Sequence, residues 1–180
     1  MKEYIIAGVV IFTFIASIIK YIISTHNYFV RQKQEIEKQK SGIEIALTAR
    51  YDTLVKLNKT VVAYSGHETN LLTGVTKIRK GMSAGELSEI AGQQSQAFSA
   101  LVENYPELKA SVNFMHLQET INDLENTIQA TRRIYNNEVS EYNSAAKSFP
   151  RSIIANKMKV QQESYFEAEA KKLNDVDLVF

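Results

Sequence analysis

The residues with the most obvious chemistry are a histidine and a carboxylate that stand next to each other, His67 and Glu68. Imidazole and carboxylate groups are ordinary ligands of zinc. A metal-binding helix would carry a second histidine four residues on, but that position is Leu71. The other two histidines, His26 and His116, are distant in the sequence, so a metal site would need side chains from different helices. We therefore interpret His67 and Glu68 as polar helix residues near a bend, with a metal site as the weaker alternative.

Carboxylates could build a di-iron centre of the kind that helical bundles hold. Such centres combine inward glutamates with Glu-x-x-His sequences on facing helices, and the chain contains no Glu-x-x-His sequence. The carboxylates of the longest predicted helix lie between its apolar positions: Glu119, Asp123, Glu125 and Glu138. The sequence predicts that they face solvent and pair with residues four positions away.

Two neighbouring arginines, Arg132 and Arg133, could clamp a ligand or a lipid headgroup together with Tyr135 and Asn136. We favour ordinary pairing of these arginines with neighbouring carboxylates on the helix surface. Tyrosines at helical spacing could form a stacking surface, but they are more often core residues whose hydroxyl groups reach a polar partner. The tyrosines concerned are Tyr51, Tyr64, Tyr105, Tyr135 and Tyr142.

Composition excludes several classes of function. The net charge of +1 gives no field that would attract nucleic acid. The absence of cysteine excludes disulfides, thiolate catalysis and cysteine-ligated metals. Gly81 and Gly85 lack the surrounding pattern of a phosphate-binding loop. We therefore expect a protein that is not an enzyme, with no catalytic, cofactor-binding or metal-binding residue and no nucleic-acid partner.

The elements that position these residues are long helices. Residues 112–149 place apolar side chains every three or four positions, which is typical of an amphipathic helix with one buried stripe. The stripe comprises Phe114, Leu117, Ile121, Leu124, Ile128, Thr131, Tyr135, Glu138, Tyr142, Ala145 and Phe149. A second stripe predicts a helix over residues 36–78 and includes two charged positions, Arg50 and Glu68. Buried charges need partners, so we expect partners for both on facing helices, with Glu138 a candidate for Arg50.

Turn and capping residues separate the predicted helices. Gly81 is expected to cap the C-terminus of the helix over 36–78. Ser83 and Glu86 form a capping box that opens the next helix, over 84–105, which Pro106 ends. Pro150 ends the helix over 112–149. Helical spacing resumes over 152–158, and residues 174–180 are expected to form an extended tail.

These elements predict an all-α fold, a long antiparallel (up-and-down) four-helix bundle preceded by one N-terminal transmembrane helix. We divide it into an anchor (1–24), a bundle (25–170) and an extended tail (171–180). Helices over 36–78 and 112–149 would be about 65 and 57 Å long, against about 33 Å for the helix over 84–105. Straight helices of these lengths would leave part of the helix over 112–149 uncovered. Either the first helix bends, or residues 150–170 fold back to cover the exposed part, and the sequence does not distinguish these.

The chain begins with an apolar segment. Residues 4–19 carry no charge and Ile22 and Ile23 extend the run beyond Lys20, which suits a membrane span over residues 4–23. A cleaved signal peptide is the alternative, but no small-residue cleavage pattern follows the segment. Basic residues are more frequent after the span than before it, so the positive-inside rule predicts an outside N-terminus and a cytoplasmic bundle. Gly8 has Phe12 four residues on, so a small-residue association motif is absent there, and self-association stays open.

Several short segments, in this order and spacing, resemble the LemA family over nearly the whole chain beyond the anchor. They are Arg50-Tyr51-Asp52, Tyr64 with His67-Glu68, residues 105–110, Asn113-Phe114, Leu117-Gln118-Glu119, residues 131–136, Val139 with Tyr142-Asn143, Ser148-Phe149-Pro150 and residues 165–169. The resemblance implies one N-terminal membrane segment, an antiparallel four-helix bundle and no catalytic residue. The chain lacks the tryptophan that members commonly carry near Lys40 and the proline they carry near Val55, so a straighter first helix is expected.

The function we predict is that of a protein-interaction or scaffold module at the bacterial inner membrane, with residues 4–23 in the lipid bilayer and an unidentified membrane-associated protein as partner. The alternative is a bundle that binds a lipid or a small ligand between its helices. A metalloenzyme is a third and weaker hypothesis.

Overall fold

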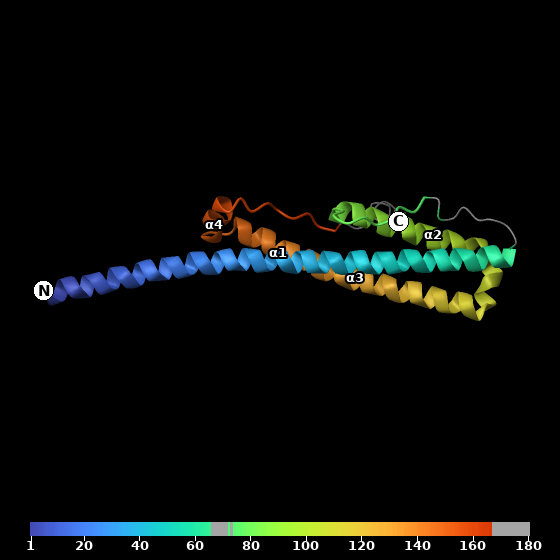
Figure 1. Cartoon of the computed structure of the whole chain (residues 1–180), viewed down its shortest axis with the longest axis horizontal. Coiled ribbons are helices and arrows are strands. Elements are labelled where there is room, and N and C mark those ends of the chain that lie inside the picture. The colour runs from blue at the N-terminus through green and yellow to red at the C-terminus, as the bar shows by residue number, and fades with distance from the viewer. Residues whose placement is uncertain (66–71, 73, 167–180) are drawn as a thin grey trace, which may run out of the picture. The chain divides into compact units, whose positions relative to one another are not determined.

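The structure is a computed structural model that describes residues 1–65, 72 and 74–166. Its helices, shown in Figure 1, are α1 (Lys2–Ser65), α2 (Ala84–Asn104), the 3-10 helix η1 (Pro106–Ala110), α3 (Val112–Lys147) and α4 (Arg151–Lys157). No strand occurs within the described residues, so the all-α prediction is confirmed. The chain divides into two compact units, which we describe separately. Unit 1 is Met1–Glu37 with Glu138–Glu163, and unit 2 is Lys38–Asn137 with Ser164–Phe180.

The core of unit 2 is the apolar stripe predicted from the sequence. Seven side chains from α1, α2, η1 and α3 form one cluster, and none is more than 2% exposed: Leu54, Leu57, Val61, Leu101, Leu108, Phe114 and Ile121. Burial of an aliphatic or aromatic side chain of this size stabilises a fold by about 1.5–3 kcal/mol. Three long helices therefore share one core, which confirms the periodicity of both stripes in this unit.

Helix α2 runs parallel to α1, which corrects the up-and-down order expected for these two helices. The Gln94 amide of α2 donates to the carbonyl of Leu47 at 3.1 Å. Further along both helices, Leu101 joins the cluster that contains Val61. Helix α3 runs antiparallel to α1, as expected, since Arg50 contacts Glu125 and a Cβ on Gly42 would lie 3.4 Å from the Thr131 methyl group.

The reason for the parallel direction is that α1 ends early. The helix predicted over 36–78 stops at Ser65, and residues 72 and 74–82 are not helical. Glycines at positions 66 and 74 cost a helix interior about 1 kcal/mol each, which outweighs the apolar pattern. The connection 66–83 can span about 60 Å when extended, enough to return along the roughly 31 Å of α2. A helix that continued to residue 78 would have left too short a connection for this return.

The turn before α2 follows the predicted chemistry only in part. Gly81 adopts a φ of +86°, which suits glycine, but it lies in a turn and caps no helix, because α1 has already ended. The capping box is confirmed: the Ser83 amide donates to the Glu86 carboxylate at 2.6 Å, and the Glu86 amide donates to the Ser83 hydroxyl at 3.2 Å. These hydrogen bonds lower the pKa of Glu86. The predicted ends of α2 at Pro106 and of α3 before Pro150 are also confirmed.

Unit 1 is built from the start of α1, the end of α3, α4 and the extended residues that follow α4. The buried Phe29 ring packs edge-to-face on Tyr142, with centroids 5.7 Å apart. The Arg151 guanidinium lies 4.5 Å from the centre of the Tyr28 ring. Figure 1 shows the chain turning back after α4 in extended form. Of the two ways to cover the long helices, the fold uses the segment after Pro150, and α1 continues through position 55 without a break.

The first part of α1 is apolar and exposed. It contains one segment long and apolar enough to cross a membrane, and none of that segment is buried. Its hydroxyl groups are satisfied within the helix, since Thr13 donates to the Val9 carbonyl at 3.0 Å and Ser17 to the Thr13 carbonyl at 2.8 Å. A lipid environment offers no hydrogen-bond partners, so polar groups within a span must find theirs inside the helix, as these hydroxyl groups do.

The capping box predicts an acid-sensitive step in stability. The pKa of Glu86 is lowered on folding, so its contribution is complete above the unfolded value of 4.5 and is lost as the pH falls through the folded value. We expect Glu86→Gln to lower the melting temperature of the full chain at pH 6, and the gap from wild type to shrink at pH 3. Thermal circular dichroism measures both. Glu89→Gln, which removes the same charge from α2 outside the box, is the control; an equal effect of both substitutions contradicts the assignment.

Candidate functional site

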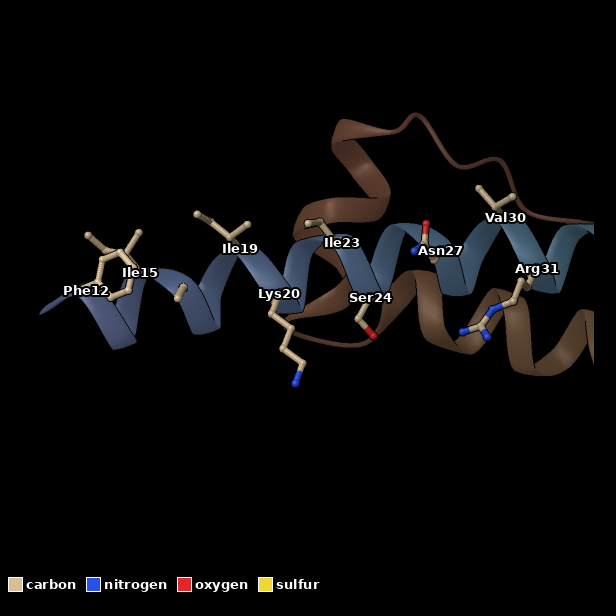
Figure 2. Close-up of a pocket in the computed structure, with 10 residues that line it drawn as sticks. Phe12, Ile15, Ile19, Lys20, Ile23, Ser24, Asn27, Val30 and Arg31 are labelled. Carbon is tan, nitrogen blue, oxygen red and sulfur yellow. The ribbon is translucent and has the colours of Figure 1, made fainter. Parts of the chain in front are cut away.

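A groove of about 820 Å³ follows one face of α1 in unit 1. Figure 2 shows its lining: Phe12, Ile15, Ala16, Ile19, Lys20, Ile23, Ser24, Asn27, Val30 and Arg31. The lining from Phe12 to Ile23, which is apolar except for Lys20, is about 17 Å long, close to half of a hydrocarbon core. No acidic side chain is among the lining residues, while Lys20 and Arg31 are cationic. The groove therefore matches an acyl chain along its apolar part and an anionic group beside its basic residues.

A second hollow, of about 460 Å³, lies in unit 1 between α1, α3 and the residues after α4. The Lys33 ammonium group donates to the Glu163 carboxylate there. Burial lowers the pKa of Lys33, but the hydrogen bond and charge of Glu163, with the charge of Glu37, outweigh burial and raise this pKa above its ordinary value. Burial also raises the pKa of the Tyr142 hydroxyl. Both groups are therefore held in the protonated form, which suits contact with Glu163 and not nucleophilic chemistry.

A polar cluster is buried in unit 2. Arg50 is 2% exposed, and its guanidinium donates to the Glu125 carboxylate at 2.6 Å and to the Ser95 hydroxyl at 2.9 Å. The prediction that Glu138 pairs with Arg50 is wrong, because Glu138 accepts a hydrogen bond from Gln32 in unit 1. The sequence predicts that Glu125 faces solvent, but α3 turns this carboxylate toward Arg50 and leaves it 31% exposed. Its predicted pairing four positions along the helix is confirmed, because the Gln129 amide donates to it at 2.8 Å. The cluster joins all three long helices through charge and hydrogen bonds.

The other predicted ligands do not come together. His26 and His116 are exposed, and the His116 ring nitrogen lies 4.0 Å from the Glu119 carboxylate. Among the described residues, no group of three or more potential metal-binding side chains occurs. His67 and Glu68 lie outside the described residues. Of the tyrosines expected in the core, Tyr135 and Tyr142 are buried, whereas Tyr64 is 63% exposed.

The residues around Arg132 bind a segment of the chain itself. The Arg132 guanidinium lies 4.6 Å from the centre of the Phe166 ring, which is 2% exposed. The Tyr135 hydroxyl donates to the Ser164 carbonyl at 2.9 Å. The Asn136 amide donates to the Phe166 carbonyl at 2.9 Å, and the Phe166 amide donates back to the Asn136 side-chain oxygen at 2.8 Å. Three of the four residues considered for a ligand or headgroup clamp thus contact an extended segment of the chain itself, and the favoured interpretation and the clamp alternative both stay predictions.

Asn143 makes the same kind of contact in unit 1. Its side-chain amide donates to the Glu163 carbonyl at 2.9 Å, and the Glu163 amide donates to the side-chain oxygen at 3.0 Å. The sequence analysis assigned no role to Asn143. The available signal was its position seven residues after Asn136, which puts both side chains on one face of α3. We call Asn136 and Asn143 the asparagine clamps.

Comparisons with known proteins give a family match and a relative. A family model described as the LemA family matches residues 39–180. The chain is 28% identical over 159 residues to Protein LemA of Metamycoplasma hominis. The aligned region covers 84% of this chain and 73% of that protein. The family match begins after the groove-bearing part of α1 and takes in the buried arginine and both asparagine clamps.

The buried arginine gives a direct test of the unit 2 core. Arg50→Met keeps most of the apolar volume but leaves the Glu125 charge without its partner. Because Glu125 is 31% exposed and can still reach water, we expect a loss of about 1–3 kcal/mol in the free energy of unfolding, less than for a fully buried pair. Denaturant unfolding of the full chain, followed by circular dichroism, measures the loss. Arg133→Met, at an exposed position of α3, is the control, and an equal loss in both variants contradicts the assigned contact.

Proposed function

The chain belongs to the LemA family, and from this membership we propose that it is a membrane-anchored helical bundle that binds a protein partner. In this proposal α1, α2, α3 and the short α4 are the four helices of the bundle. The observation that carries the proposal is the change within α1, which is exposed and apolar at its start and buried along one stripe from Thr25 onward. One uninterrupted helix thus serves both as a candidate membrane span and as a member of a packed core.

Exposed apolar side chains supply surfaces for a partner. Outside the candidate span, unit 2 exposes Ile45 (68%), Val112 (61%), Met115 (49%) and Ile134 (48%). Aliphatic side chains that stay in water contribute nothing to the core and favour binding when a partner covers them. These positions lie on α1 and α3, the two longest helices.

The proposed location is the bacterial cell membrane, crossed once through residues 4–23. Basic residues support an outside N-terminus and a cytoplasmic bundle, because Lys2 precedes the span and several lysines and arginines follow it. These residues are Lys20, in the last turn of the span, and Arg31, Lys33, Lys38 and Lys40 after it.

A second candidate function is lipid binding, and the groove on α1 favours it. The groove is lined by apolar side chains and by the cationic residues Lys20 and Arg31, and no acidic residue lies among them (Figure 2). An anionic phospholipid has matching chemistry, with its headgroup beside the basic residues. In this case the chain would act through the lipid it holds and not through a protein partner.

One crosslinking experiment separates the two functions. A photoreactive residue is placed at Ile134, at Asn27 in the groove, or at the exposed polar position Lys56, in the full chain in cells. We expect one reproducible protein adduct from Ile134 and none from Lys56. The Ile134 adduct should be lost when Ile45→Glu or Met115→Glu puts a charge at another of these exposed apolar positions. Lipid adducts from Asn27 without any protein adduct from the apolar positions would contradict the interaction module and support lipid binding.

Protease treatment of spheroplasts tests the orientation. The loop residues 74–82 follow α1 and contain Lys77, Arg79 and Lys80, which trypsin recognises. We expect the bundle to be protected in intact spheroplasts and cleaved after detergent is added. Cleavage before detergent places the bundle outside, and release of intact protein into the medium contradicts the membrane span.

A further inference from the structure

The segment that ends α3 and forms α4 is basic and carries exposed apolar side chains. Residues 142–162 contain no acidic residue, and their basic residues are Lys147, Arg151, Lys157 and Lys159. Within the same segment Phe149 is 81% exposed and Ile153 is 61% exposed. The whole segment belongs to unit 1. Cationic side chains interleaved with exposed aromatic and aliphatic ones are typical of a surface that lies on an anionic membrane.

The end of α3 lies level with the end of the proposed membrane span. Phe29 of α1 packs edge-to-face on Tyr142 of α3. One turn further along α1, the Gln32 amide donates to Glu138, which lies one turn earlier on α3. The two helices are therefore antiparallel in unit 1, and α3 continues past Tyr142 toward the apolar start of α1. Its last residue, Lys147, lies about 7.5 Å beyond Tyr142, level with the α1 residue that directly follows the span over residues 4–23.

The cover that the protein provides for α1 begins at the same level. All residues of the range 1–24 are exposed, and Thr25 is the first buried residue of α1. In Figure 2 the brown ribbon of α3 and α4 lies alongside α1 from about Ile23 onward. The Arg151 guanidinium lies 4.5 Å from the centre of the Tyr28 ring. Tyr28 is five residues past Ile23, about 7.5 Å along the helix, which is about the depth of the headgroup layer.

We propose that residues 147–159, the basic end of unit 1, lie on the bilayer and bind its anionic phospholipid headgroups, with Phe149 and Ile153 inserted at the interface. A basic side chain close to an anionic surface strengthens such binding by about five-fold. The proposal rests on the proposed span over residues 4–23 and goes beyond it, because a span alone leaves the bundle free to tilt. A second contact beside the span fixes the tilt of unit 1, and with it the side of unit 1 that a partner can reach.

The chain contains no tryptophan, so a single indole placed in the full chain reports the depth of one position. The chain is reconstituted at low protein density in vesicles of phosphatidylcholine and anionic phosphatidylglycerol, with part of the lipid brominated on its acyl chains. Phe149→Trp probes the proposed contact, and Phe12→Trp probes the span. Gln34→Trp, at an exposed position about 16 Å past Ile23 along α1, is the control. We expect the brominated lipid to quench Phe149→Trp and Phe12→Trp and to leave Gln34→Trp unquenched.

The role of charge is measured on Phe149→Trp. Its quenching should fall at least about two-fold in vesicles of phosphatidylcholine alone. Adding Lys147→Gln and Lys157→Gln should cause a similar fall in the anionic vesicles, since each substitution removes one of the attractive charges. Adding Lys56→Gln and Lys59→Gln instead removes the same charge from exposed positions of unit 2 and should leave the quenching unchanged.

The three indole positions separate failure of this contact from failure of the span. Quenching of Phe12→Trp without quenching of Phe149→Trp overturns the contact and leaves the span intact, whereas an unquenched Phe12→Trp overturns the span and the contact with it. Equal quenching of Phe149→Trp in neutral and anionic vesicles overturns headgroup binding. Emission of Phe149→Trp that shifts to shorter wavelength without quenching, and only at high protein density, assigns the segment to a second copy and also overturns the proposal.

Discussion

The constraint on which the rest of this fold depends is the need to cover the apolar stripe of α3. Helix α3 has 36 residues and is about 54 Å long, whereas α2 has 21 residues and covers only about 31 Å. In unit 2 the stripe is closed by α1 and α2, around Phe114 and Ile121. In unit 1, where Tyr142 belongs to the same stripe, α4 and extended chain take the place of a second long helix. The short α2 thus creates the need for the segment after Pro150.

An extended segment that covers a helix needs hydrogen-bond partners for its backbone, whereas a covering helix pairs its backbone groups internally. An extended segment leaves its own N–H and C=O groups without internal partners, and a buried unpaired group costs about 1–3 kcal/mol. Asn136 and Asn143 solve this at Phe166 and Glu163, because a side-chain amide offers one donor and one acceptor in the geometry of a neighbouring strand. The contacts that complete the core therefore also pair backbone groups of the returning segment.

Local signals in the sequence predicted more of the fold than of the site. The apolar stripes, the Ser83–Glu86 capping box and the helix ends at Pro106 and Pro150 depend on residues close together in the sequence. The box and both helix ends are confirmed. The stripes are confirmed only in part, because α1 ends at Ser65 and the stripe residue Phe149 is 81% exposed beyond the end of α3. The direction of α2 depends on where α1 ends, and the apolar pattern that continues beyond Ser65 favoured a longer helix despite the cost of two glycines. The partner of Arg50 depends on the register of α3 against α1, which residues close together in the sequence do not specify. Asn143 could not be assigned from its type alone, because asparagine on a helix usually faces solvent, and only the geometry of the returning segment gives it a role.

Helix α1 shows how one element serves two environments without a break. Its first residues are apolar on every side and none is buried, a pattern that suits lipid, which offers no preferred face. From Thr25 the buried positions recur as Phe29, Ile36, Ile43 and Leu47, at steps of four and seven, which is the pattern of a helix with one protein-covered face. The change occurs within the groove of Figure 2, between Lys20 and Arg31, where the polar residues Ser24 and Asn27 follow the apolar run that ends at Ile23. A boundary set by side chains within a continuous helix needs no flexible linker, because hydrogen bonds between backbone groups are complete on both sides of it.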